Sequence, residues 1–96
     1  MSIEEILRGK REEILQIVRR HGADQVRVFG SVARGEAQAD SDIDLLVRPG
    51  PNTSSWFPAG LILELEDLLG RRVDVLTEGA LHWYIRDRIL AEAVPL

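Results

Sequence analysis

Apolar residues near the start of the chain recur at the spacing of a helix. Ser2 followed by Glu5 forms a capping-box pattern, which predicts that a helix begins there. The residues from Gly9 to Arg11 interrupt the apolar pattern and predict a kink or a split, and Gly22 is suited to end the helical region. The apolar positions of this region are Ile3, Ile6, Leu7, Ile14, Ile17 and Val18.

Three later segments carry the β-branched, alternating pattern of strands. The pattern predicts strands over 25–29, 42–47 and 71–77. The segment SVARGE after the first strand can form a short helix. The loop that follows the second strand is rich in Pro, Gly and Asn.

Two further helices are expected. Ser54 or Ser55 is predicted to cap a helix that runs to about Leu69, with Pro58 in its first turn and Gly70 as its stop. Thr77 is predicted to cap the last helix. Its apolar face consists of Leu81, Tyr84, Ile85, Ile89 and Ala93. The order of elements indicates an α/β (α+β) fold, a small sheet with helices packed on it.

Size and composition limit the function classes. The chain has 96 residues, so we expect a single domain over 1–96. It has no cysteine, which excludes disulfides and thiolate metal sites. We expect a cytoplasmic protein, because no segment reads as a signal peptide or a membrane span. The net charge of −4, without a basic stripe, argues against direct nucleic-acid binding.

The segment DIDLLV places two carboxylates in an otherwise apolar strand. Residues two apart on a strand share a face, so Asp42 and Asp44 point one way while Ile43, Leu45 and Val47 point the other. Two such close carboxylates need a proton or a cation. Mg²⁺ takes oxygen ligands, and a pair of ions can stabilise the attacking and leaving oxygens of phosphoryl or nucleotidyl transfer.

Asp74 is a third carboxylate in similar surroundings, between Val73 and Val75. Alone, it reads as a solvent-facing residue on an edge strand. If its strand pairs beside the second strand, Asp74 joins Asp42 and Asp44. When Asp74 is considered together with Asp42 and Asp44, its membership of one carboxylate cluster is the favoured interpretation.

Gly30 and Ser31 directly follow the first strand. Glycine permits close approach of the backbone, and free N–H groups with a serine hydroxyl suit a triphosphate. An ordinary strand-to-helix turn is the simpler alternative. Arg34 could neutralise the triphosphate or be a solvated helix charge. Ten residues separate Ser31 from Asp42, so Gly-Ser and Asp-x-Asp stand at a fixed spacing.

The remaining polar and aromatic candidates have simpler interpretations. Asp40 and Ser41 are expected to form a turn. His21 and His82 are expected at the surface. Trp56 and Phe57 are expected to pack in the core, with adenine stacking or a partner contact as the less favoured alternatives. Trp83 lies off the apolar face of the last helix and is expected to be exposed, which suits an interface.

Gly30-Ser31, Arg34-Gly35-Glu36 and DSDIDLLV resemble the nucleotidyltransferase superfamily of the DNA polymerase beta type, and more narrowly the minimal nucleotidyltransferase (MNT) family. GRRVDVLT and the C-terminal segment are also similar to that family. The resemblance implies a nucleotidyltransferase fold with a small mixed β-sheet. It implies that Gly30 and Ser31 hold nucleotide phosphates and that Asp42 and Asp44 bind two Mg²⁺ ions. It also implies that Asp74 completes the metal site and helps to deprotonate the acceptor hydroxyl.

The same resemblance implies transfer of AMP from ATP to a tyrosine hydroxyl of a HEPN ribonuclease toxin. The chain would then be the antitoxin of a HEPN/MNT system and would form a hetero-oligomer with its toxin. A chain of 96 residues has little room for an acceptor site of its own. Two alternatives stay open, an antitoxin that neutralises its toxin by binding alone and a nucleotidyltransferase acting on a small molecule.

Overall fold

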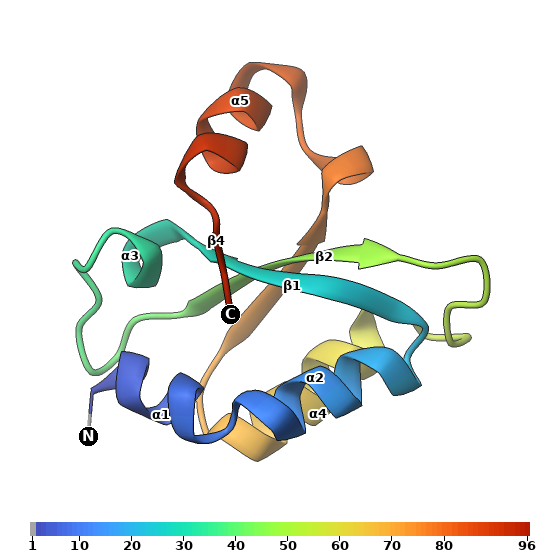
Figure 1. Ribbon diagram of the computed structural model, residues 1–96, viewed down its shortest axis with the longest axis horizontal. Coiled ribbons are helices and arrows are strands. Elements are labelled where there is room, and N and C mark those ends of the chain that lie inside the picture. The colour runs from blue at the N-terminus through green and yellow to red at the C-terminus, as the bar shows by residue number, and fades with distance from the viewer. Residues whose placement is uncertain (1) are drawn as a thin grey trace.

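The N-terminal region forms two helices, as the sequence predicts. A computed structural model describes residues 2–96, with α1 over Ile3–Gly9 and α2 over Arg11–Arg20 (Figure 1). The Ser2 hydroxyl accepts a hydrogen bond from the Glu5 N–H at 3.1 Å, and the Glu5 carboxylate accepts one from the Ser2 N–H. The capping box and the split at Lys10 are therefore confirmed.

The centre of the fold is a four-stranded mixed sheet in the order β3-β2-β1-β4. The strands are β1 (Ala23–Phe29), β2 (Ile43–Pro49), β3 (Val73–Thr77) and β4 (Val94–Pro95). The β2–β3 pair is parallel, and β1 pairs antiparallel with both β2 and β4. The predicted fold class is confirmed, although β4 was not predicted because two residues carry no alternating pattern.

The middle helix begins later than predicted. It spans α4 (Ala59–Leu69), and Pro58 lies at its N-cap rather than in its first turn. The Ser54 hydroxyl is instead bonded to His21, which holds this segment against the end of α2. Gly70 ends α4 in the left-handed conformation, with φ of 67°, as expected of a glycine stop.

The segment after β3 also differs from the prediction. Thr77 precedes a short 3₁₀ helix, η1 (Glu78–Ala80), and makes no side-chain cap, while α5 (Trp83–Glu92) begins after His82. The intervening turn brings Leu81 into the core. Tyr84 was expected on the buried face of the last helix, but it is 65% exposed.

The sheet separates two apolar layers. Figure 1 shows α1, α2 and α4 on one side of the sheet and α5 on the other. Odd-numbered β2 residues enter the larger core, while even-numbered Leu46 enters the smaller one under α5. The larger core includes Ile14, Val18, Val28, Ile43, Leu45, Val47, Leu61, Leu65 and Val75, and the smaller one is built on Phe29, Leu46 and Leu81. Within residues 2–96, no helix is long and apolar enough to cross a bilayer.

Candidate active site

The two carboxylates at the start of β2 lie on the α5 face of the sheet. Ile43 and Leu45 are fully buried in the opposite layer, which leaves Asp42 and Asp44 pointing away from the larger core. Asp44 is half-buried, and Asp42, one residue before the strand, is exposed. The predicted division of the segment into an apolar and a carboxylate face is confirmed.

Asp74 is the direct partner of Asp44 in the parallel β2–β3 pair. Residues opposite one another in a sheet point to the same face, so these two carboxylates lie side by side. The condition set by the sequence for a three-carboxylate cluster, that the third strand pairs beside the second, is therefore met. Asp74 itself is exposed, so the cluster opens to solvent.

This arrangement perturbs Asp44. Burial, followed by the negative charges of Asp74 and Asp42, raises the pKa of Asp44 from 3.8 to about 6. Arg34 partly offsets the rise. None of the ion pairs among residues 2–96 involves Asp42, Asp44 or Asp74. The cluster thus holds negative charge without a bound side-chain cation.

The cluster fits a hard divalent cation by its donors and its charge. All three side chains offer carboxylate oxygens, the ligand type that Mg²⁺ prefers, and a cation would relieve their mutual repulsion. In the described part of the chain, no three Asp, Glu, His or Cys side chains lie so that they could hold one metal ion together. Metal binding by Asp42, Asp44 and Asp74 therefore stays a prediction.

Gly30 allows the backbone after β1 to pass against Asp44. Its φ is +74°, a conformation that side-chain-bearing residues rarely adopt. A Cβ at this position would lie 3.1 Å from Asp44 Cγ and closer still to Asp44 Oδ2. A glycine is thus required here by both the backbone conformation and the neighbouring carboxylate.

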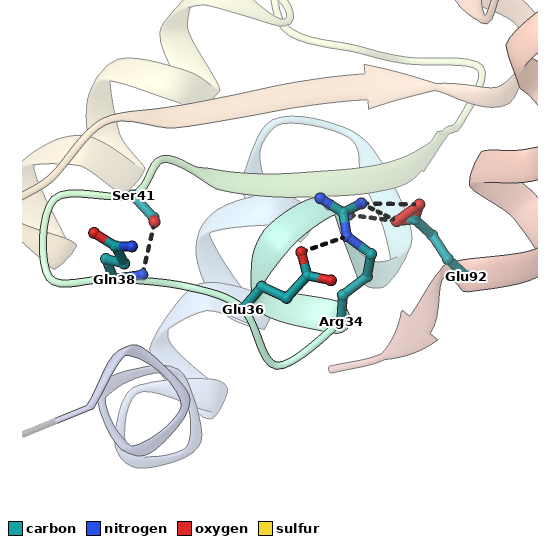
Figure 2. Close-up of polar contacts among 6 residues, drawn as sticks. Arg34, Glu36, Gln38, Ser41 and Glu92 are labelled. Atoms are coloured by element: carbon teal, nitrogen blue, oxygen red, sulfur yellow. Dashed lines mark hydrogen bonds and ion pairs between the residues drawn. The ribbon is translucent and has the colours of Figure 1, made fainter.

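The Gly30 N–H is engaged by Glu92, a residue that the sequence did not single out. Gly30 begins α3 (Gly30–Ala33), and its N–H donates to Glu92 Oε2 at 3.1 Å. Arg34 Nη1 donates to the same oxygen at 2.9 Å, and Arg34 Nε lies 3.4 Å from Glu36 (Figure 2). Glu92 is 62 residues from Gly30 in the chain, so no local pattern could have revealed it.

Ser31 lies half-buried in α3. No side-chain hydrogen bond among residues 2–96 engages its hydroxyl, which leaves that group available to a ligand. Gly30 therefore has a structural role, through its bond to Glu92 and its close approach to Asp44. The Ser31 hydroxyl has no such structural contact within the described chain. The phosphate-binding roles of Gly30, Ser31 and Arg34 remain predictions.

The turn before β2 is formed as expected. Ser41 Oγ accepts a hydrogen bond from the Gln38 N–H at 2.8 Å (Figure 2). Asp40 is exposed in the same turn. These contacts confirm that Ser41 and Asp40 shape the approach to β2.

His21 is the clearest difference from the sequence-based interpretation. It was expected at the surface, but its side chain is only 14% exposed. Nδ1 lies 2.8 Å from Ser54 Oγ and Nε2 lies 2.9 Å from Glu64 Oε1. The ring therefore joins α2, the loop before α4 and α4 itself. Its partners are 33 and 43 residues away, beyond the reach of sequence spacing.

The aromatic residues divide between exposed and packed positions. Trp56 is 79% exposed, so the predicted core packing is wrong for this residue, whereas Phe57 packs at the edge of the larger core. Trp83 is 81% exposed and His82 is exposed beside it, as predicted.

Residues 11–96 match a family model described as a nucleotidyltransferase domain. The chain is 45% identical over 94 residues to the "putative protein adenylyltransferase MJ0435" of Methanocaldococcus jannaschii, covering 98% of this chain and 97% of that protein. It is 39% identical over 93 residues to the "protein adenylyltransferase MntA" of Thermococcus cleftensis, covering 97% and 91%.

Solved structures agree with these similarities. One, described as a "putative minimal nucleotidyltransferase", is 52% identical and superposes with a TM-score of 0.83 over 96% of this chain and 94% of that one. Another, a "toxin-antitoxin with AMP-PNP", is 19% identical with a TM-score of 0.74, over 88% of this chain and 69% of that one. At that identity the likeness concerns the fold alone. Together these matches confirm the fold expected from the sequence.

Proposed function

The chain belongs to the nucleotidyltransferase domain family and is a nucleotidyltransferase enzyme, and on that premise we propose that it transfers AMP from ATP to a hydroxyl group of a partner protein. The observation that carries the proposal is the in-register pairing of Asp44 with Asp74, beside the turn that begins with Gly30 and Ser31.

Asp42, Asp44 and Asp74 would hold the metal ions. Bound Mg²⁺ supplies charge neutralisation at the triphosphate and a lower pKa for the attacking hydroxyl. The raised pKa of Asp44 supports this role, because a site with uncompensated negative charge gains most from a cation.

Ser31 and Arg34 would bind the triphosphate tail. The Ser31 hydroxyl donates to a phosphate oxygen, and the Arg34 guanidinium offers planar N–H donors and a fixed charge. Gly30 keeps this turn close to Asp44, so the phosphates and the carboxylates share one small region.

The transfer itself is an in-line exchange at the α-phosphorus of ATP. The acceptor oxygen forms a bond to that phosphorus while the bond to the bridging oxygen of the leaving pyrophosphate breaks. The proton of the acceptor hydroxyl passes to a carboxylate oxygen of Asp74 and then to solvent. Asp74 is suited to this role because it is the exposed member of the paired carboxylates.

The partner is proposed to be a HEPN ribonuclease toxin, modified and inactivated at a tyrosine hydroxyl, with this chain as its antitoxin. The names of the relatives support a protein acceptor, since both curated proteins are called protein adenylyltransferases. A solved structure of the same fold is a toxin–antitoxin complex. The exposed position of Asp74 supports an acceptor that approaches from outside the chain.

The deciding experiment is intact-protein mass spectrometry of the cognate HEPN protein after incubation with this chain, ATP and Mg²⁺. We expect a mass gain of one or more AMP units, located on tyrosine by peptide mapping. The Asp42→Asn/Asp44→Asn double variant should give no gain. If the wild-type chain and the double variant neutralise the toxin equally, and neither changes the mass of the toxin, the chain is a binding antitoxin instead.

A further inference from the structure

Glu92, near the end of α5, contacts two groups of the proposed nucleotide site at once. Its carboxylate accepts a hydrogen bond from the Gly30 N–H at 3.1 Å and from Arg34 Nη1 at 2.9 Å. Its side chain is 17% exposed and that of Arg34 is 39% exposed, so the Glu92 carboxylate is shielded from water more than the carboxylate of most surface ion pairs. Resting on the function proposed above, we propose that Glu92 is a positioning residue that aims Arg34 at the phosphates of ATP.

The way Arg34 is held supports this role. Nη1 is bonded to Glu92 and Nε lies near Glu36, while no hydrogen bond within the described chain takes Nη2. In Figure 2 the guanidinium lies between the two carboxylates, with one terminal nitrogen directed away from Glu92. A planar guanidinium held at Nη1 by Glu92 presents Nη2 in a defined direction. Glu92 thus leaves Arg34 able to bind an anion.

Glu92 also fixes the turn that Arg34 belongs to. Gly30 begins the short α3 segment, and Arg34 directly follows it. The Glu92 carboxylate bonds to both residues and so connects the two ends of α3 to α5. The surface beside this contact is a groove lined by Phe29, Arg34, Ile89 and Glu92, among others, so a ligand can approach Arg34 from solvent. α5 therefore sets the geometry of the proposed phosphate-binding turn.

Glu36 provides a matched control. It also pairs with Arg34, but at 3.4 Å and with a side chain that is 64% exposed, and among residues 2–96 the Gly30 N–H is bonded to Glu92 rather than to Glu36. Exposed pairs of this length contribute little. Glu36→Gln and Glu92→Gln each remove one negative charge near Arg34. Only Glu92→Gln removes a charge that is largely shielded from water.

The test measures the dissociation constant of Mg-ATP by calorimetry, together with KM and kcat for ATP in the transfer reaction. Glu92→Gln keeps the side chain's shape and an oxygen for the Gly30 N–H but loses the charge-assisted bond to Arg34. We expect the dissociation constant and KM to rise about tenfold, with kcat changed less than about threefold. Glu36→Gln should change either value less than about twofold.

A double-mutant cycle shows whether Glu92 acts through Arg34. Arg34→Gln alone should weaken ATP binding at least as much, and Glu92→Gln should then add nothing further. Unchanged ATP binding by Glu92→Gln would overturn the inference. Tighter ATP binding would also overturn it, because Glu92 would then compete with the phosphates for Arg34. An equal effect of Glu36→Gln would overturn it as well. If the wild-type chain binds no ATP, the proposed function fails and the inference fails with it.

Discussion

Asp44 and Asp74 are direct partners in the parallel pair of β2 and β3. Because the pair is parallel and in register, the two carboxylates lie on one face although 30 positions separate them in the sequence. Asp42, one strand period earlier, extends the same face. The site is therefore set by strand pairing more than by any loop.

Asp44→Asn is expected to abolish transfer. The substitution keeps the side chain's size but removes the carboxylate at the centre of the cluster, so we expect the rate of AMP transfer to fall about 100-fold or more. Time-resolved mass spectrometry of the partner protein measures this rate. Asp67→Asn, an exposed change on α4 at the other face of the sheet, is the control and should retain full activity.

The metal-free protein should become more stable on the same substitution, in a pH-dependent way. The folded-state pKa of Asp44 is raised from 3.8 to about 6, so its ionisation opposes folding. The penalty is absent below about pH 4, grows as the pH rises, and is complete above about pH 6. Because water still reaches the group, we expect Asp44→Asn to raise the free energy of unfolding by about 1–2 kcal/mol at pH 7.5.

Thermal unfolding at pH 4 and pH 7.5, each with and without Mg²⁺, measures this effect. Added Mg²⁺ should raise the Tm of the wild-type chain at pH 7.5 and leave that of Asp44→Asn nearly unchanged. A wild-type Tm that ignores Mg²⁺ at high concentration would contradict metal binding by the cluster.

Gly30→Ala tests the close approach of backbone and carboxylate. An alanine at φ of +74° is strained, and its Cβ would collide with Asp44. Gly35→Ala is a matched control, because φ is +72° there and a Cβ would meet nothing within 4 Å. Both variants should lose about 1 kcal/mol of stability to backbone strain.

Only Gly30→Ala should also lose activity, by more than about tenfold, because the collision displaces the Asp44 carboxylate. Denaturant unfolding and the transfer assay are run on both proteins. Equal activities in the two variants would show that the contact with Asp44 is unimportant.

His21→Ala should destabilise the fold without affecting the chemistry of the site. The substitution removes the hydrogen bonds to Ser54 and Glu64 and releases the loop before α4. We expect a loss of about 1–2 kcal/mol in the free energy of unfolding. His82→Ala, at an exposed position next to Tyr84, should change stability by less than about 0.5 kcal/mol. A Tm equal to that of the wild type for His21→Ala would refute this role.

Features that depend on local pattern were predictable from the sequence. The shared face of Asp42 and Asp44 follows from the period of a strand. The start of α1 follows from Ser2 and Glu5, and the end of α4 follows from Gly70. The side-by-side position of Asp74 was predictable only as a condition, because strand order is not encoded in any single segment. The parallel β2–β3 pairing supplied that condition.

Features that depend on long-range contacts were missed. The partners of His21 and Glu92 lie more than 30 residues away in the chain, so each residue resembles an ordinary surface charge when taken alone. The start of α4 was misplaced because Ser54 has the chemistry of a helix cap but bonds to His21 instead. In each case a tertiary contact competed successfully with the local preference.

The last part of the chain bridges opposite edges of the sheet, because β3 and β4 are the two edge strands. The bridge is secured at one end by the five-residue β3 and at the other by the two-residue β4, in which Pro95 has no N–H to donate. Lifting α5 from the sheet therefore requires release of the short β4 pairing and the Leu96 N–H bond to Val26. The bonds of Glu92 to Gly30 and Arg34 and the small apolar layer under α5 must be released as well. The α5 face can open as a local unfolding event, at a free-energy cost below that of global unfolding, while the larger core stays closed.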